Sequence, residues 1–136
     1  MRWLLRINFM VAVLVLVSGG ALSMTEASFF EFNEDLYGAL DNNLRMIMLY
    51  LAVTEIAVVA FCIFTKKFEL LTLMGFFLIL MIGSMQFYGE VNTVAIDSNF
   101  TWFFLYTGLS HFVFGMSETI AKNETMATKH SHSDNF

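Results

Sequence analysis

Residues 44–64 read LRMIMLYLAVTEIAVVAFCIF, and only two of these side chains, Arg45 and Glu55, are charged. With a rise of 1.5 Å per residue, a helix of this length spans about 31 Å, close to the roughly 30 Å hydrocarbon core of a bilayer. We therefore expect a membrane-spanning helix here. Glu55 lies near its middle, where an ionisable group costs roughly 2.5 to 3.5 kcal/mol and normally faces a partner or a cavity.

Three further apolar runs have spanning length, at residues 3–24, 70–88 and 100–121. The composition agrees, because 57% of the side chains are hydrophobic, only 14% are charged and proline is absent, unlike an average soluble domain. The sequence predicts an all-α integral membrane protein. Residues 1–121 form a four-transmembrane-helix bundle, and residues 122–136 form a polar tail.

The first run also has the features of a cleaved signal peptide. It begins with the basic residues Arg2 and Arg6, continues with an apolar core over residues 9–17 and reaches a small-x-small motif at residues 21–23. Arg6 and Asn8 weaken it as a span, although an arginine near a helix end can extend its charge to the headgroups. We expect a retained helix, with cleavage as the alternative.

Basic residues cluster in three regions that share one side of the membrane if all four helices span. Six of the seven belong to these clusters, at Arg2, Arg6, Lys66, Lys67, Lys122 and Lys129. The opposite side carries mainly acidic residues and Arg45 alone. By the positive-inside rule, both termini and the turn at residues 66–67 are predicted to be cytoplasmic.

The long connection at residues 25–43 predicts a short amphipathic external helix between the first two spans. Ser28 followed by Glu31 fits a capping box. Apolar residues then recur at helical spacing, at Phe29, Phe32, Leu36 and Leu40. Such a helix would form a lid over the end of the bundle, or alternatively a docking surface for a partner subunit.

Small and polar residues indicate which helix faces meet. On the third predicted helix they form one stripe at helical spacing, comprising Thr72, Gly75, Gly83 and Gln86. Gly108, His111 and Gly115 form a similar stripe on the fourth helix, and Glu55 lies on one on the second. Glycine allows close approach of a second backbone in a membrane, so we expect these stripes to point inward.

Four residues then form a candidate intramembrane polar site: Glu55, His111, Gln86 and Arg45. Glu55 and His111 would lie at similar depth, and a carboxyl within reach of an imidazole can exchange a proton. The alternatives are a hydrogen-bonded pair that ties two helices together, a proton relay, a quinone headgroup site or haem ligation by His111. The chain has no second intramembrane histidine for a bis-histidine haem, and no motif specifies quinone, so the cofactor stays open.

Other chemistry has little support in the sequence. A lone Cys62 within a predicted span favours neither a disulfide nor a thiolate metal site, and no metal site is predicted. No catalytic motif, glycine-rich phosphate loop or basic nucleic-acid-binding patch is present. We expect no nucleic-acid partner. The expected partners are membrane lipids and other integral membrane subunits.

The order of these features resembles the DoxX-like group of small four-helix bacterial membrane proteins. The first helix opens with arginine, a long external segment follows, Asn43-Leu44-Arg45 leads into the second helix, and a short Lys66-Lys67 turn precedes two more helices. The resemblance covers residues 1–121. DoxX is associated with membrane oxidoreductase complexes that pass electrons to quinone, so the resemblance implies a redox-complex subunit of the bacterial inner membrane.

These features predict a non-catalytic accessory or assembly subunit of a larger inner-membrane complex. The chain has no soluble domain with which to bind a polar substrate, whereas its aromatic and glycine-rich helix faces can pack against neighbours. The alternative is a quinone-linked or proton-coupled redox subunit that acts through Glu55 and His111. No catalytic activity of the chain's own is required by the first interpretation.

Overall fold

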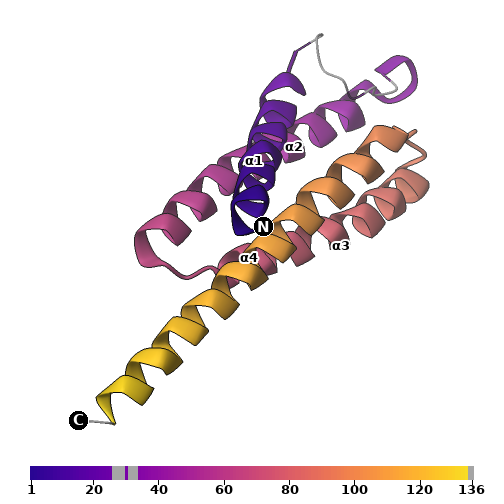
Figure 1. Ribbon diagram of the computed structural model, residues 1–136. Coiled ribbons are helices and arrows are strands. Elements are labelled where there is room, and N and C mark those ends of the chain that lie inside the picture. The colour runs from indigo at the N-terminus through magenta and orange to yellow at the C-terminus, as the bar shows by residue number, and fades with distance from the viewer. Residues whose placement is uncertain (26–29, 31–33, 135–136) are drawn as a thin grey trace.

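Four helices form the fold in the computed structural model, which describes residues 1–25, 30 and 34–134, apart from the side chains of residues 34–41. They are α1 (Arg2–Leu22), α2 (Glu34–Thr65), α3 (Glu69–Asn92) and α4 (Ser98–Ser133) (Figure 1). The all-α prediction is confirmed. The predicted runs 44–64, 70–88 and 100–121 lie within α2, α3 and α4, whereas the run 3–24 extends two residues beyond the end of α1 at Leu22.

Three of the helical segments are long and apolar enough to cross a membrane. They are Arg2–Leu22, Asn42–Thr65 and Glu69–Asn92. α4 is not among them because His111, Glu118 and several hydroxyl side chains reduce its hydropathy. These helices indicate a membrane protein, while a fourth span through α4 remains a prediction.

Each helix packs on the next one in the sequence, and α4 also packs on α1, so the four helices form a closed ring. α3 packs most extensively on α4, α1 packs on both α2 and α4, and α2 touches α3 least. Within the described part of the chain, the backbones of α2 and α4 make no direct contact, so these two helices lie diagonally across the bundle. Any link between them must therefore come from long side chains.

The bundle interior contains two apolar clusters. The larger one, near the end where α3 leads into α4, includes Leu16, Leu44, Met48, Leu78, Phe100 and Phe104. The smaller one comprises Phe9, Cys62, Leu71 and Phe114, one residue from each helix. The core thus depends on all four helices.

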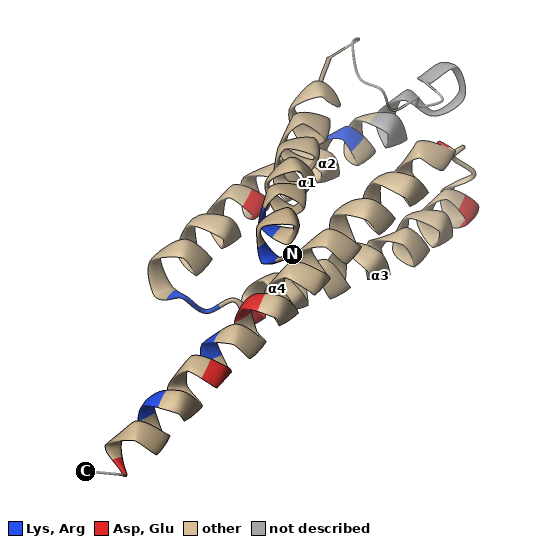
Figure 2. Ribbon diagram, in the orientation of Figure 1, with Lys and Arg blue, Asp and Glu red and all other residues tan. Residues whose placement is uncertain are grey.

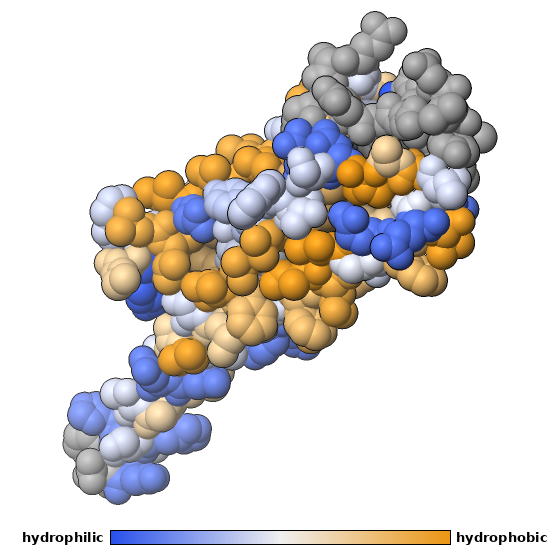
Figure 3. Space-filling view, turned by 90° about the vertical axis from the view of Figure 1, so that its right-hand side faces the viewer, coloured by the Kyte–Doolittle hydropathy of each residue, from blue (hydrophilic) through white to orange (hydrophobic). Residues whose placement is uncertain are grey.

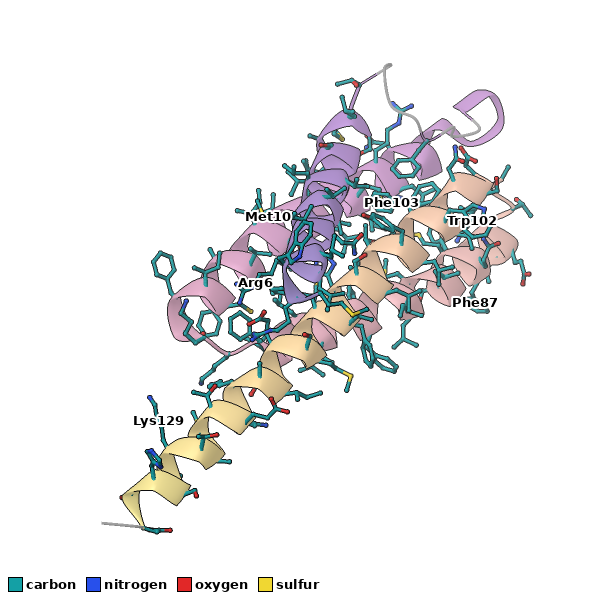
Figure 4. All side chains as sticks on the ribbon, viewed as in Figure 1. Arg6, Met10, Phe87, Trp102, Phe103 and Lys129 are labelled. Atoms are coloured by element: carbon teal, nitrogen blue, oxygen red, sulfur yellow. The ribbon has the colours of Figure 1, made fainter. Side chains whose placement is uncertain are left out.

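Much of the outer surface is also apolar. Figure 3 shows extensive hydrophobic surface on the bundle, whereas the projecting part of α4 is mainly hydrophilic. Phe87 on α3 and Trp102 on α4 are both exposed (Figure 4). Charged residues gather mostly toward the helix ends and along the projecting part of α4, with long uncharged stretches between them (Figure 2). An apolar belt of this kind suits contact with lipid.

α2 and α3 each end at a residue with a left-handed backbone conformation, Lys66 after α2 and Thr93 after α3. Lys66 and Thr93 have φ values of 58° and 54°, in the left-handed region that commonly terminates helices. The Val94 N–H donates to the Gly89 carbonyl at 3.0 Å, which closes the end of α3. At the start of α4, the Asp97 side chain accepts from the Asn99 N–H at 3.0 Å and caps the helix.

The predicted external helix differs from the structure. Residues 34–43 are helical, but they are the first turns of α2 and not a separate element. The predicted capping box at Ser28 and Glu31, and the apolar positions 29 and 32, lie outside the described residues, as do the side chains of Leu36 and Leu40. Phe30 is described: it is buried and stacks on Phe100, with a ring-centroid distance of 4.4 Å. This part of the connection therefore covers the end of α4.

Most of the predicted polar tail, residues 122–133, is helical. α4 continues through Ser133, far beyond residue 121, and projects away from the bundle (Figure 1). Residues 123–133 are exposed. The extension is absent from a prediction based on apolar runs because its residues form a helix without an apolar stripe.

Candidate functional site

Glu55 on α2 and His111 on α4 lie in direct contact at the centre of the bundle. The Oε1 atom of Glu55 and the Nε2 atom of His111 form a short hydrogen bond, and both side chains are 0% exposed. Because the two helix backbones do not touch, this bond joins α2 and α4 across the diagonal. It is a direct polar link between two diagonally opposite helices.

The tautomer of His111 follows from its second hydrogen bond. Its Nδ1 atom lies 2.6 Å from the carbonyl oxygen of Thr107, which can only accept, so Nδ1 carries a proton. Nε2 then either accepts a proton from a neutral Glu55 carboxyl or donates one to a Glu55 carboxylate. In both states one proton lies between the two side chains and the pair is neutral overall, which an apolar interior tolerates.

Aromatic side chains fix the imidazole from the α1 side. The Phe9 ring meets His111 edge-on, with centroids 5.0 Å apart, and stacks on Phe114 at 4.2 Å. Thr107, one turn before His111, is itself buried and donates its hydroxyl to the Phe103 carbonyl at 2.7 Å. The pair is therefore enclosed by packed groups, where a hydrogen bond is stronger than in water.

One atom of the pair remains unpaired. The second carboxyl oxygen of Glu55, Oε2, is buried and has no hydrogen-bond partner among the described residues. A buried acceptor without a partner costs about 1 to 3 kcal/mol. Such exceptions accompany redox or catalytic roles as well as structural strain, so this oxygen is the feature of the site that favours chemistry.

The other two residues of the predicted polar site lie elsewhere. Gln86 is exposed on α3 and lines a groove of about 390 Å³ with Glu90 and Thr93. Arg45 is half-buried ten residues before Glu55 on the same helix, about 15 Å along its axis. Its carbonyl accepts from the Ser23 hydroxyl at 3.5 Å. The structure thus brings Glu55 and His111 together but not Gln86 or Arg45.

A second set of polar contacts joins α1 to α4. Nη2 of Arg2 and Nε of Arg6 both bind the Glu118 carboxylate, at 3.3 and 3.2 Å respectively. Asn8 donates to the Ser110 hydroxyl at 3.0 Å and accepts from the Tyr106 hydroxyl at 3.1 Å. Arg6 and Asn8 weaken the apolar character of α1 in the sequence. Their polarity was in fact the available signal that α1 has a polar partner.

Glycine permits the close contact between α3 and α4. A Cβ built at Gly75 would lie 2.5 Å from the Gly108 carbonyl oxygen and would also collide with the Phe112 backbone. A Cβ at Gly115 would lie 2.5 Å from both the backbone nitrogen and the hydroxyl oxygen of Thr72. These four predicted packing residues, Thr72, Gly75, Gly108 and Gly115, therefore meet at one seam.

Gly83 does not belong to this seam. It is exposed, and no atom lies within 4 Å of a Cβ built there, so its predicted place in a helix contact is wrong. Each four-residue step turns an α-helix about 40° past a full turn, so Gly83 is rotated about 80° from Gly75. Leu78 faces the core instead and is fully buried.

The contact between α1 and α2 also depends on a glycine, Gly20, which is not among the predicted packing residues. A Cβ at Gly20 would lie 2.6 Å from the Met48 carbonyl oxygen and would collide with the Ala52 side chain. The small-residue run Ser18-Gly19-Gly20-Ala21 was the available signal.

Among the residues that the structure describes, the site lacks an arrangement of side chains suited to bind a metal ion or haem iron. No group of three or more histidine, cysteine or carboxylate side chains gathers within the described ranges. Both ring nitrogens of His111 are already engaged by Thr107 and Glu55, so neither nitrogen faces an open coordination position. Haem ligation by His111 would require the diagonal hydrogen bond to break.

These observations define the class of the protein: an all-helical bundle with three helices that could span a bilayer and a buried carboxyl–imidazole pair. Comparisons of the chain with protein-family models, curated proteins and solved structures find no match.

Proposed function

We propose that this chain is a non-catalytic accessory or assembly subunit of a larger complex in the bacterial inner membrane. The observation that carries the proposal is the enclosure of Glu55 and His111. Both side chains are 0% exposed and bonded to each other, which suits a tie between helices better than a site that a substrate must enter.

The outer surface supports a role in association. Large apolar side chains remain exposed on every helix, including Leu14, Ile56, Phe87 and Trp102. Lipid can cover them, and so can the helices of neighbouring subunits, since helices in lipid associate through packing of this kind. The DoxX-like resemblance adds the proposal that the parent complex is respiratory or otherwise redox-active.

The proposed topology has four spans with both termini in the cytoplasm. Arg2 and Arg6, the Lys66-Lys67 turn and Lys122 lie at one end of the bundle, where Lys122 donates to the Lys66 carbonyl at 3.1 Å (Figure 2). The positive-inside rule assigns this end to the cytoplasm.

A second candidate is a proton-coupled or quinone-linked redox subunit. The buried, unpartnered Oε2 of Glu55 favours it, because this oxygen could accept a proton when the pair rearranges. Glutamine variants discriminate between the two candidates, since Glu55→Gln and His111→Gln retain hydrogen bonding but remove the acid or the base.

The test is gentle purification from the native membrane, with identification of co-migrating proteins, a visible spectrum and an electron-transfer assay. The accessory role predicts stoichiometric co-purification with larger membrane subunits and nearly normal assembly and activity in both glutamine variants. Migration of the chain alone would contradict it. Near-complete loss of electron transfer with assembly unchanged would favour the redox candidate.

A further inference from the structure

The outer face of the α1–α4 seam combines a cationic end with an apolar groove. Arg2 and Arg6 lie near the start of α1, and their side chains are 57% and 58% exposed although both contact Glu118. Figure 4 shows Arg6 near the N-terminal end of α1. Within the described part of the chain, the remaining guanidinium N–H groups of both arginines have no protein acceptor.

Glu118 holds the two arginines side by side. Its carboxylate takes one nitrogen from each, so the two guanidinium groups converge from successive turns of α1. Each keeps further donors, and a guanidinium presents its donors in a planar fork that matches phosphate oxygens. This end of the seam therefore has the donors for an anion.

A hollow beside Arg2 begins the groove, and Arg6, which does not line it, contacts the same Glu118 carboxylate as Arg2. The hollow has a volume of about 370 Å³ and is lined by Arg2 from α1 and by Ser117, Ile120, Ala121 and Glu124 from α4. Its walls are thus partly apolar directly next to a cation.

A second hollow continues along the same seam toward the middle of the bundle. It has a volume of about 260 Å³ and is lined by Leu5, Asn8, Tyr106, Leu109, Ser110 and Val113. The two linings follow one face of each helix, because Arg2, Leu5 and Asn8 are spaced by three residues and Tyr106, Ser110, Val113 and Ser117 by three or four. The side chains of Asn8, Ser110 and Tyr106 are hydrogen-bonded to one another, so this hollow does not require a polar ligand.

The dimensions of the seam match one leaflet. From Ser117 to Tyr106 the helix rises about 16 Å, roughly half the thickness of the hydrocarbon core. A ligand that fits has an anionic end at the membrane surface and an apolar chain that runs to the midplane.

We propose that this seam binds one anionic phospholipid, with its phosphate at Arg2 and Arg6 and an acyl chain in the groove toward Tyr106. Basic pockets between helices at the cytoplasmic surface recognise anionic headgroups in this way. The inference requires that the bundle, including α4, lies in a bilayer, and it is independent of the accessory role.

The full chain in detergent is titrated with phosphatidylglycerol, and native mass spectrometry counts bound lipid. Phosphatidylcholine with the same acyl chains is the neutral control. We expect one phosphatidylglycerol per chain at concentrations at which phosphatidylcholine does not bind. Equal binding of the two lipids would overturn the proposal.

Charge variants locate the site. Arg6→Gln should weaken phosphatidylglycerol binding about tenfold, as expected for loss of a charge-assisted hydrogen bond. Lys129→Gln removes the same charge from the projecting part of α4 and should bind like the unmodified chain (Figure 4). If the two variants weaken binding equally, the lipid is attracted by net charge and not by this seam.

Two further variants keep the test decisive if Arg6→Gln fails to fold. Glu124→Gln removes the acidic group from the groove without touching the Glu118 contact, so it should tighten phosphatidylglycerol binding. Leu109→Trp fills the apolar hollow from an exposed position and should reduce binding. Unchanged binding in both would overturn the proposal.

Inorganic phosphate distinguishes a lipid headgroup from a free anion. At equal concentration it should leave the phosphatidylglycerol adduct intact, because it cannot occupy the apolar groove. Complete displacement would show that the arginines bind free phosphate and would overturn the lipid assignment.

Discussion

The Nε2 atom of His111 is bonded to the Oε1 atom of Glu55 across the diagonal of the bundle, between two helices whose backbones do not touch. The imidazole is oriented by Thr107 on one side and by the Phe9 ring on another. This pair of side chains therefore ties α2 to α4, and the apolar clusters, which include side chains of both helices, pack around it.

Removal of both partners of this pair should destabilise the bundle by less than the sum of the two single removals. Glu55→Leu or His111→Leu alone leaves a buried polar group without its partner, which costs about 1 to 3 kcal/mol. The double variant removes both polar groups and should cost less than the sum of the single variants. Unfolding in detergent, followed by the reactivity of the buried Cys62 thiol, measures all three. Strictly additive losses would mean that the two side chains do not interact.

The glycines of α3 should respond oppositely to the same substitution. Gly75→Ala places a methyl group 2.5 Å from the Gly108 carbonyl oxygen and should cost about 1 to 3 kcal/mol through overpacking. Gly83→Ala meets open space and should be neutral or stabilise the helix by up to about 1 kcal/mol. Thermal denaturation in detergent compares the two. Similar losses in both variants would show that Gly83 also lies against a neighbour.

Cysteine labelling tests the proposed topology. In a Cys62→Ala background, single cysteines at the exposed positions 67 and 95 should be labelled from the cytoplasmic and external sides, respectively. A membrane-impermeant maleimide applied to intact cells and to inverted vesicles gives the readout. The reverse pattern would overturn the orientation.

A cysteine at position 128 tests whether α4 spans. It lies on the exposed extension and should be labelled from the same side as position 67 if α4 crosses the bilayer. Labelling from the side of position 95 would mean that only the three most apolar helices span.

The extension of α4 should be dispensable for the stability of the bundle. A chain that ends at Asn123 loses the ten helical residues 124–133, which are all exposed. We expect an unchanged melting temperature and a smaller helical circular dichroism signal, because the lost turns contribute no core packing. A lower melting temperature would indicate that the extension stabilises the bundle.

Hydrophobic runs predict the helices of this protein well, because apolarity and length are local properties of the chain. Residues 44–64, for example, lie entirely within α2. Helix ends are predicted less well. The α4 extension is a polar segment that continues a helix already formed by the residues before it, which the apolar pattern does not record. At residues 34–43 the pattern predicts a helix but not that this helix is continuous with α2.

The contacts between helices depend on how each helix is rotated, and a pattern of three and four residues specifies rotation only approximately. Over two four-residue steps the error reaches about 80°, enough to take Gly83 out of a seam that includes Gly75. The places of Glu55 and His111 near the middle of apolar runs were evident from the sequence. The bond between Glu55 and His111 and the contacts of Glu118 with Arg2 and Arg6 join residues that are remote in sequence, so they follow from the packing of the four helices against one another. The same packing leaves Gln86 and Arg45 away from the Glu55–His111 pair.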